Sequence, residues 1–466
     1  MTTLDDSVNA PVLPAPMPRR GPLPFFEFFR VMRDNMIATY SEEAYESAIV
    51  HRKIFGRHRF VLSEPAAIKH VLLDNAANYQ KTEIARRLLE PGLGRGLVTS
   101  EGETWRRHRR TMAPSFDLRS IAAYTPIMSA ATEELLTEWS RLGANEPVDV
   151  ATAMMKLTLH IISRTMFSTD SEAMLAIMER GAGSYQAGMR PNIMDFLGLP
   201  AWLAGLPRAR VAGRSLGEFD AEIDRLTQLR SGASGGGHKD LLARLIEARD
   251  DETGSGMSAK DVRDHVITIF MAGHETTAMA MTWTWYLLSQ HPREEAMLHA
   301  ELAAVLGGRA PTDEDVGKLV YTRMVIEESM RLYPPVHTIS RSALADDMLL
   351  GRTIPKGSTI LIVPWVLHRH RLLWKNPGAF IPERFSTEQS AARPRFSYLP
   401  FGGGRRICIG AAFAITEATV LLATIAQRYR LRLVAGHPVE PRGLITLRAR
   451  HGMQMVPVPR QSPSPH

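Results

Sequence analysis

The chain has 466 residues, a formal net charge of +7 at pH 7 and a single cysteine, so an intramolecular disulfide framework is excluded. A basic balance can indicate nucleic-acid partners, but the sequence has no long basic block and no nucleic-acid motif, which argues against that class. Length alone allows about three domains. No strong linker divides the chain, however, and we expect a flexible tail over residues 1–24 and one large domain over residues 25–466.

The first 24 residues are rich in proline and polar groups. They lack the apolar core of a signal peptide and the apolar length, about 20 residues, of a membrane anchor. The sequence therefore predicts a soluble, cytoplasmic protein without a transmembrane anchor.

The N-terminal half alternates between helical and irregular patterns. Residues 25–49 read as an amphipathic helix, residues 51–63 as a hairpin, and residues 65–73 as a helix with proline in its first turn. Glycines over residues 88–98 predict an irregular loop. Trp105 and Arg109 follow, one helical turn apart, so both can face one partner, although most basic runs are solvated surface.

Residues 117–180 are helical by pattern, and two less regular segments follow them. Residues 185–207 are apolar but broken by proline and glycine, which favours a substrate lid or entry site that could also touch a membrane surface. Residues 231–237 are mostly glycine and serine and predict a flexible loop.

A long apolar helix is predicted over residues 261–288, and the ionisable residues that interrupt it distinguish it from a membrane span. Gly273 and Thr276 at its centre weaken a regular helix, as is common at functional sites. Glu275 and Thr276 are an acid and a hydroxyl that could relay protons. Alternatively, Glu275 and Thr276 are a solvated pair on the helix surface without a catalytic role.

Residues 401–410 contain three consecutive glycines followed by the only cysteine, Cys408, just before a predicted helix. Glycines allow a tight turn and close approach to a flat partner. A helix N-terminus favours the thiolate, which under such a bend suits a haem iron, whereas a lone cysteine is more often a small buried apolar residue.

This ten-residue string resembles the haem-ligand loop of the cytochrome P450 family. The matching positions are Phe401, Gly402, Gly404, Arg406, Cys408 and Gly410. The resemblance implies a mainly α fold with small β-sheets, in which haem b (iron protoporphyrin IX) lies between the long distal helix and the cysteine loop. Cys408 would be the axial metal ligand, and Phe401, Gly402 and Gly410 would contact the cofactor.

The resemblance assigns roles to other matching positions as well. It implies that haem propionates bind Trp105, Arg109, Arg341 and Arg406, and that Glu275 and Thr276 form the catalytic acid–alcohol pair. It also implies a buried structural network of Glu328, Arg331 and Arg384. Substrate-pocket positions would be Leu88, Val98, Ala272, Val336, Thr338 and Ile445.

The function implied is insertion of one atom of O2 into a hydrophobic substrate such as a fatty acid, terpenoid or aromatic. The sequence has no flavin or iron–sulfur motif, so a separate ferredoxin or flavodoxin with its reductase would supply electrons. We expect Arg106, Arg107 and Arg110 to remain solvated. Together with Arg405 they would lie on the Cys408 side of the haem and favour an acidic partner. The alternatives are a haem-thiolate isomerase, a peroxide-dependent peroxygenase, and a haem-binding sensor without catalysis.

Overall fold

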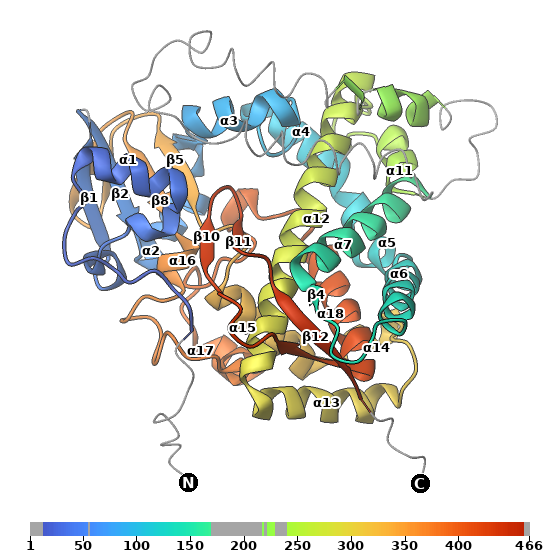
Figure 1. Cartoon of the computed structure of the whole chain (residues 1–466). Coiled ribbons are helices and arrows are strands. Elements are labelled where there is room, and N and C mark those ends of the chain that lie inside the picture. The colour runs from blue at the N-terminus through green and yellow to red at the C-terminus, as the bar shows by residue number, and fades with distance from the viewer. Residues whose placement is uncertain (1–12, 55, 169–216, 219–220, 229–239, 461–466) are drawn as a thin grey trace.

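The computed structural model describes residues 13–54, 56–168, 217–218, 221–228 and 240–460. Figure 1 shows the largest sheet on one side of the molecule and most helices on the other, with helix α12 (Ala259–Gln290) running between other helices of the larger part. The mainly α architecture with small sheets is confirmed. The predicted lid segment, residues 185–207, and the glycine-rich loop, residues 231–237, lie outside the described residues.

The first helix, α1 (Phe25–Asp34), is shorter than the sequence predicted. Two 3-10 turns, Met36–Thr39 and Glu42–Tyr45, follow in place of the helix expected up to residue 49. Asn35 explains the end, because its backbone is extended and its side-chain amide donates to the Pro441 carbonyl oxygen and accepts from the Gly443 amide, at 2.8 Å each. A long-range contact thus ends a helix that the local pattern would continue.

The largest sheet has the strand order β1-β2-β8-β5-β3, with β2 and β8 parallel and the other pairs antiparallel. The predicted hairpin is confirmed as β1 and β2. The strands of this sheet are β1 (Ile49–Ile54), β2 (Arg57–Leu62), β3 (Tyr79–Gln80), β5 (Ile339–Ala343) and β8 (Thr359–Ile362). The smaller sheets are β4-β12-β9 (Val148–Asp149, Gln454–Pro459, Tyr429–Leu433), β6-β7 (Asp347–Leu349, Arg352–Ile354) and β10-β11 (Pro441–Gly443, Leu447–Ala449).

The segment predicted as an irregular loop, residues 88–98, is helical in its first half. Helix α3 (Glu83–Leu93) begins at Thr82, whose hydroxyl accepts from the Ala85 amide, and continues through Pro91 in its last turn. Gly94, with a φ of 60°, ends it. The predicted irregular path is therefore confined to the residues after Leu93.

Two of the remaining helices, α2 (Pro65–Lys69) and α16 (Pro364–Leu367), lie beside the largest sheet (Figure 1) and pack in its apolar cluster. The others are α4 (Gly102–Met112), α5 (Leu118–Ala122), α6 (Thr125–Trp139), α7 (Val150–Phe167), α11 (Leu241–Glu247), α13 (Pro292–Leu306), α14 (Asp313–Val316), α15 (Val320–Leu332), α17 (Thr387–Ala392) and α18 (Ala411–Arg428). Helices α5 to α7 account for the described part of the helical pattern predicted over residues 117–180.

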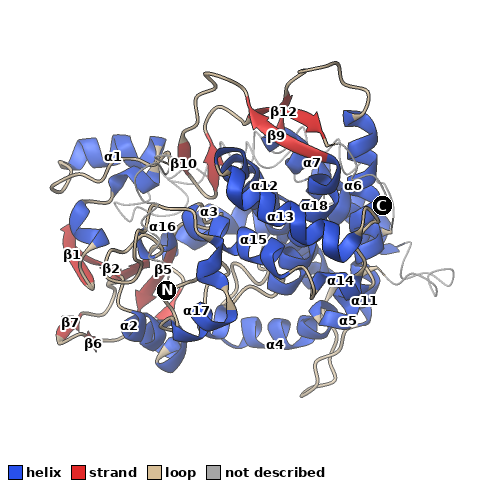
Figure 2. Cartoon of the chain, turned by 90° about the horizontal axis from the view of Figure 1, so that it is seen from below, coloured by secondary structure: helices blue, strands red, loops and turns tan. Residues whose placement is uncertain are grey.

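Helix α12 confirms the long helix predicted over residues 261–288 and is the most central element. A capping box fixes its start, because the Ser258 hydroxyl accepts from the Asp261 amide and the Asp261 carboxylate accepts from the Ser258 amide. Figure 2 shows it surrounded by α13, α15 and α18, with which it packs. Among the described residues, no helix has both the length and the apolar character needed to cross a bilayer.

Candidate functional site

The site rests on a buried ion pair in α15. Glu328 and Arg331 are fully buried and pair through two hydrogen bonds of 2.6 and 2.7 Å, in agreement with their i, i+3 spacing. Arg331 also donates to the carbonyl oxygens of His368, Pro377 and Ala379, at 2.8 Å each. Because every donor of this guanidinium has an acceptor, α15 is fixed to the chain that precedes the cysteine loop.

The third member of the predicted network lies close to this pair. The Arg384 Nε atom is 3.4 Å from a Glu328 carboxylate oxygen, and its Nη2 atom donates to the Asn376 carbonyl oxygen at 2.9 Å. The structure therefore brings all three residues together. Glu328 accepts the Ile381 amide at 2.8 Å as well, which ties the Arg384 segment to α15.

The cysteine loop is a tight structure held from both ends. The Cys408 amide donates to the Phe401 carbonyl oxygen at 2.9 Å, closing the loop on itself. Gly404 has a φ of 66°, and a Cβ there would collide with the carbonyl oxygen of Leu72. Position 404 therefore needs glycine for two reasons, its positive φ and the lack of room for a Cβ atom, as the sequence indicated. Gly402 also has a positive φ, of 71°, and Gly410 caps helix α18.

Cys408 is solvent-accessible, yet nearby protein atoms partly desolvate its thiol, so it lies in a concave part of the surface. Burial raises the pKa of this thiol, and the Gly410 amide and the Arg109 charge only partly oppose that effect. The helix N-terminus therefore favours the thiolate as expected, but without a bound metal its effect on the Cys408 pKa is smaller than that of desolvation. A metal ion would supply the missing stabilisation, since a coordinating thiol is deprotonated.

A cluster of cationic side chains lies beside the loop. The Arg109 Nη1 atom donates to the Ile407 carbonyl oxygen at 2.6 Å, and the Arg406 guanidinium lies over the Trp105 ring, 4.4 Å from its centroid. Arg406 also pairs with Glu101. Burial lowers the pKa of Arg341 to about 10, and the nearby Arg406 charge adds to that effect.

Lys81 completes this cluster and was missed by the sequence analysis. Its ammonium donates to the Val98 carbonyl oxygen, and its pKa falls to about 7 because it is buried and lies near Arg406 and Arg341. Only Glu101 opposes the shift. No local pattern marks this lysine, and only its burial among other cations distinguishes it from a surface residue.

These features fit a haem. Three buried or partly buried cations, Lys81, Arg341 and Arg406, face one carboxylate, Glu101, so the cluster has an excess of positive charge that an anionic group would balance. The two propionates of haem are such groups. Cys408 is solvent-accessible, as a residue that binds the haem iron must be.

On helix α12, Ala272 is exposed and Thr276 partly exposed, although neighbouring Thr277 and Ala278 are buried. The Thr276 hydroxyl donates to the Ala272 carbonyl oxygen at 2.8 Å. The Glu275 carboxylate is bound by Thr446 and Arg448 near the C-terminus. The sequence analysis did not predict these two partners, because they lie about 170 residues away.

The predicted pocket residues come from four separate segments. Val336 and Ile445 are exposed apolar residues, at 39% and 41%. Their segments are joined, because His337 Nε2 lies 2.9 Å from the Leu444 carbonyl oxygen. Thr338 is half-buried beside Tyr40, and Leu88 is half-buried in α3. Val98 packs against the apolar cluster that also holds Met271 and Ile409.

Glu417 of α18 is a second carboxyl group that the sequence analysis missed. It is 1% exposed, and burial raises its pKa to about 8, with a hydrogen bond to Thr277 opposing the shift. Thr277 directly follows Thr276 on α12. The helix after the cysteine loop and the distal helix are therefore joined by a largely protonated acid.

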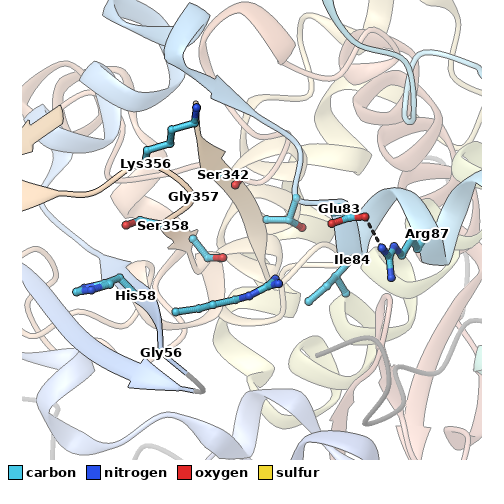
Figure 3. Close-up of a pocket in the computed structure, with 12 residues that line it drawn as sticks. Gly56, His58, Glu83, Ile84, Arg87, Ser342, Lys356, Gly357 and Ser358 are labelled. Atoms are coloured by element: carbon cyan, nitrogen blue, oxygen red, sulfur yellow. Dashed lines mark hydrogen bonds and ion pairs between the residues drawn. The ribbon is translucent and has the colours of Figure 1, made fainter. Parts of the chain in front are cut away.

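A separate polar cavity of about 400 Å³ lies between the β1–β2 turn, the start of α3 and the ends of β5 and β8. Figure 3 shows His58 and Lys356 on one side and the Glu83–Arg87 ion pair on the other. It shares no lining residue with the candidate site.

The basic residues expected to stay solvated are partly neutralised. Arg110 pairs with the buried Asp250 at 2.5 Å and with Glu252 at 2.7 Å, so the expectation is wrong for this residue. Arg106 pairs with exposed Glu103 at 2.8 Å. Arg405 is exposed, and Arg107 is half-buried beside His108.

Comparison with known proteins gives consistent matches along most of the chain. A sequence model described as cytochrome P450 matches residues 11–450. The chain is 39% identical to cyclooctatin synthase of Streptomyces melanosporofaciens, over 88% of this chain and 89% of that protein. It is 37% identical to cyclooctat-9-en-7-ol 5-monooxygenase of the same organism, over 81% of each. Putative cytochrome P450 132 of Mycobacterium tuberculosis is 32% identical over 88% of this chain and 90% of its own.

Proposed function

Because this chain belongs to the cytochrome P450 family and is a P450 monooxygenase, we propose that it binds haem b through Cys408 and oxygenates a hydrophobic organic substrate. The observation that carries the proposal is the joint presence of an accessible cysteine in a glycine-rich loop and an unbalanced cluster of buried cations beside it. The bound haem supplies the oxygen chemistry of the family.

The residues of this chain hold the cofactor from several elements. Cys408 gives the axial thiolate, and the loop glycines Gly402, Gly404 and Gly410 allow the backbone to approach the ring. The propionates would be bound by Trp105, Arg109, Arg341 and Arg406, and the burial of Lys81 near Arg341 and Arg406 supports this lysine as a further partner. The Glu328–Arg331–Arg384 network keeps the loop in place from behind.

Helix α12 provides the groups that handle protons. Thr276 offers a hydroxyl at the exposed face of the helix beside the small Ala272, which leaves space for O2 and substrate. Glu275, next to it, is the acid that passes protons to this hydroxyl. Together they let one oxygen atom leave as water while the other enters the substrate.

The substrate is an apolar molecule, bound by Leu88, Val98, Ala272, Val336, Thr338 and Ile445. The exposed side chains of Val336 and Ile445 support this, because accessible apolar side chains favour contact with an apolar ligand. Because one relative is a cyclooctat-9-en-7-ol 5-monooxygenase, cyclooctat-9-en-7-ol is the first compound to test.

Electrons come from a separate partner, and we propose a ferredoxin or flavodoxin with its reductase in the cytoplasm. Exposed Arg405 precedes Cys408 by three residues and would meet an acidic partner close to the haem.

The test is a carbon monoxide difference spectrum of the reduced holoprotein. We expect a red-shifted Soret band for the wild type and its loss in Cys408→Ser, with an unchanged far-ultraviolet circular dichroism spectrum. The same band in Cys408→Ser would overturn the proposal.

Product formation separates the remaining alternatives. Oxygenation of cyclooctat-9-en-7-ol with NADPH, ferredoxin and its reductase supports a monooxygenase reaction with this substrate class. Product with peroxide alone favours the peroxygenase alternative. Ligand-induced spectral shifts without reductant consumption favour a sensor.

A further inference from the structure

The Glu275 carboxylate is held entirely through one of its two oxygens. Its Oε1 atom accepts hydrogen bonds from the Thr446 hydroxyl and from Arg448 Nε and Nη2, the last two at 2.9 and 2.5 Å. Within the part of the chain that the structure describes, no hydrogen bond reaches Oε2. The side chain is 15% exposed, so the pair is only weakly screened by solvent.

The segment that carries the two partners is itself firmly anchored, with Thr446 just before strand β11 and Arg448 within it. Leu447 is fully buried, its amide donates to the Pro335 carbonyl oxygen at 2.9 Å, and its carbonyl oxygen accepts from Trp283 Nε1 at 3.3 Å. Thr446 and Arg448 flank Leu447, and both reach the same Glu275 oxygen. The anchored backbone at Leu447 therefore holds both groups on Glu275.

The same hairpin provides a contrast. Arg442 and Arg450 also pair with a carboxylate, but theirs is Asp34, whose side chain is 51% exposed. Surface pairs of that kind contribute little. The Glu275–Arg448 ion pair, in contrast, is partly buried, and Glu275 directly precedes Thr276. We therefore infer that this pair does more than attach the hairpin to helix α12.

We propose that Arg448 is a positioning residue for Glu275: with Thr446 it fixes the carboxylate through Oε1 and leaves Oε2 as the oxygen that takes up and releases protons. This inference rests on the proposed function. It explains how an acid can be held in place by a cation and still serve a proton relay, because the two tasks fall on different oxygens.

Proton delivery can be measured without the natural substrate. With NADPH, a plant-type ferredoxin and its reductase, O2 takes two electrons and two protons when it leaves as hydrogen peroxide, and four of each when it becomes water. The electrons come from NADPH and the protons from NADPH and solvent. The holoprotein variants are Arg448→Gln, Arg448→Lys and, as the matched control, Arg442→Gln on the same hairpin.

We expect Arg448→Gln to lower the rate of water formation about tenfold and to raise the share of O2 released as hydrogen peroxide. Arg448→Lys should restore most of the water formation, because an ammonium can still hold Oε1. Arg442→Gln should match the wild type. Thermal unfolding midpoints and the carbon monoxide spectrum should be similar in all four proteins.

A double-mutant comparison decides whether Arg448 acts through Glu275. In a Glu275→Gln background, Arg448→Gln should cause no further loss. A full additional loss, or wild-type peroxide release in Arg448→Gln alone, overturns the inference while the proposed function stands. A wild-type protein that lacks the thiolate carbon monoxide band and consumes no O2 overturns both.

Discussion

Burial gives Lys81 a property that a lysine on the surface would not have. A lysine in water keeps its charge far above neutral pH, but burial next to Arg406 and Arg341 lowers the pKa of Lys81 to about 7. An anion bound beside it would restore the charge. The lysine therefore costs stability when the site is empty and contributes to affinity when a carboxylate occupies it.

We expect haem affinity to depend on pH through this residue. Below about pH 7 Lys81 is charged before haem binds, whereas above that pH binding must first take up a proton, so affinity should fall as pH rises. Lys81→Met should flatten this dependence and speed haem loss at pH 6 about tenfold. Transfer of haem to excess apomyoglobin measures the rate.

Lys53→Met is the control for this experiment, because Lys53 is an exposed lysine in β1. It should behave as the wild type. An identical pH dependence in the wild type and in Lys81→Met would show that this lysine does not meet the propionates.

Among the elements, the connection from α15 to the cysteine loop depends on one buried guanidinium. Removing Arg331 would leave Glu328 buried without its partner and three carbonyl oxygens without a donor. We expect Arg331→Ala to lower the free energy of unfolding by about 3–5 kcal/mol. Urea unfolding followed by circular dichroism measures the change.

Arg323→Ala on the same helix is the matched control. Arg323 is 59% exposed and pairs with Glu327 at 3.5 Å, so its loss should change stability by less than about 1 kcal/mol. Equal effects of the two substitutions would contradict the buried network.

The contact between α12 and α18 gives a stability effect that depends on pH. Burial raises the pKa of Glu417 from 4.5 to about 8, so the folded chain keeps this proton over a range in which the unfolded chain has lost it. The contribution of protonated Glu417 to the stability of the fold is complete below pH 4.5 and is lost as pH rises through 8. Glu417→Gln should be about as stable as the wild type at pH 4.5 and a few kcal/mol more stable at pH 8.

Denaturant unfolding at several pH values tests this expectation, with exposed Glu314→Gln as the control. The control should show the pH slope of the wild type. A Glu417→Gln protein with that same slope would mean that the acid is ionised within the fold.

For the molecule as a whole, the structure reduces the number of arginines that could bind an acidic redox partner. Asp250 and Glu252 neutralise Arg110, which leaves exposed Arg405 and half-buried Arg107 as the stronger candidates. We expect the rate of reduction by an acidic ferredoxin to fall as salt is added and to fall in Arg405→Gln. Stopped-flow reduction under carbon monoxide measures both.

Arg352→Gln removes an exposed arginine from β7, in the β-rich part, and should leave the reduction rate unchanged. A rate that is independent of salt in every variant would argue against electrostatic docking.

The sequence alone determined the features that depend on local spacing. The hairpin of β1 and β2, the length of α12, the glycine turn before Cys408 and the Glu328–Arg331 pair all arise from residues that are near one another in the chain. Periodicity and turn chemistry act over a few residues, so such features can be predicted from the pattern alone.

Only the tertiary structure decided which distant groups meet. Asn35 ends α1 by bonding to residues near the C-terminus, Arg448 binds Glu275, and Asp250 neutralises Arg110. The pKa values of Lys81, Cys408 and Glu417 likewise depend on burial, which no local pattern records. The energy of a charge is set by its surroundings in space, and residues far apart in the sequence supply those surroundings.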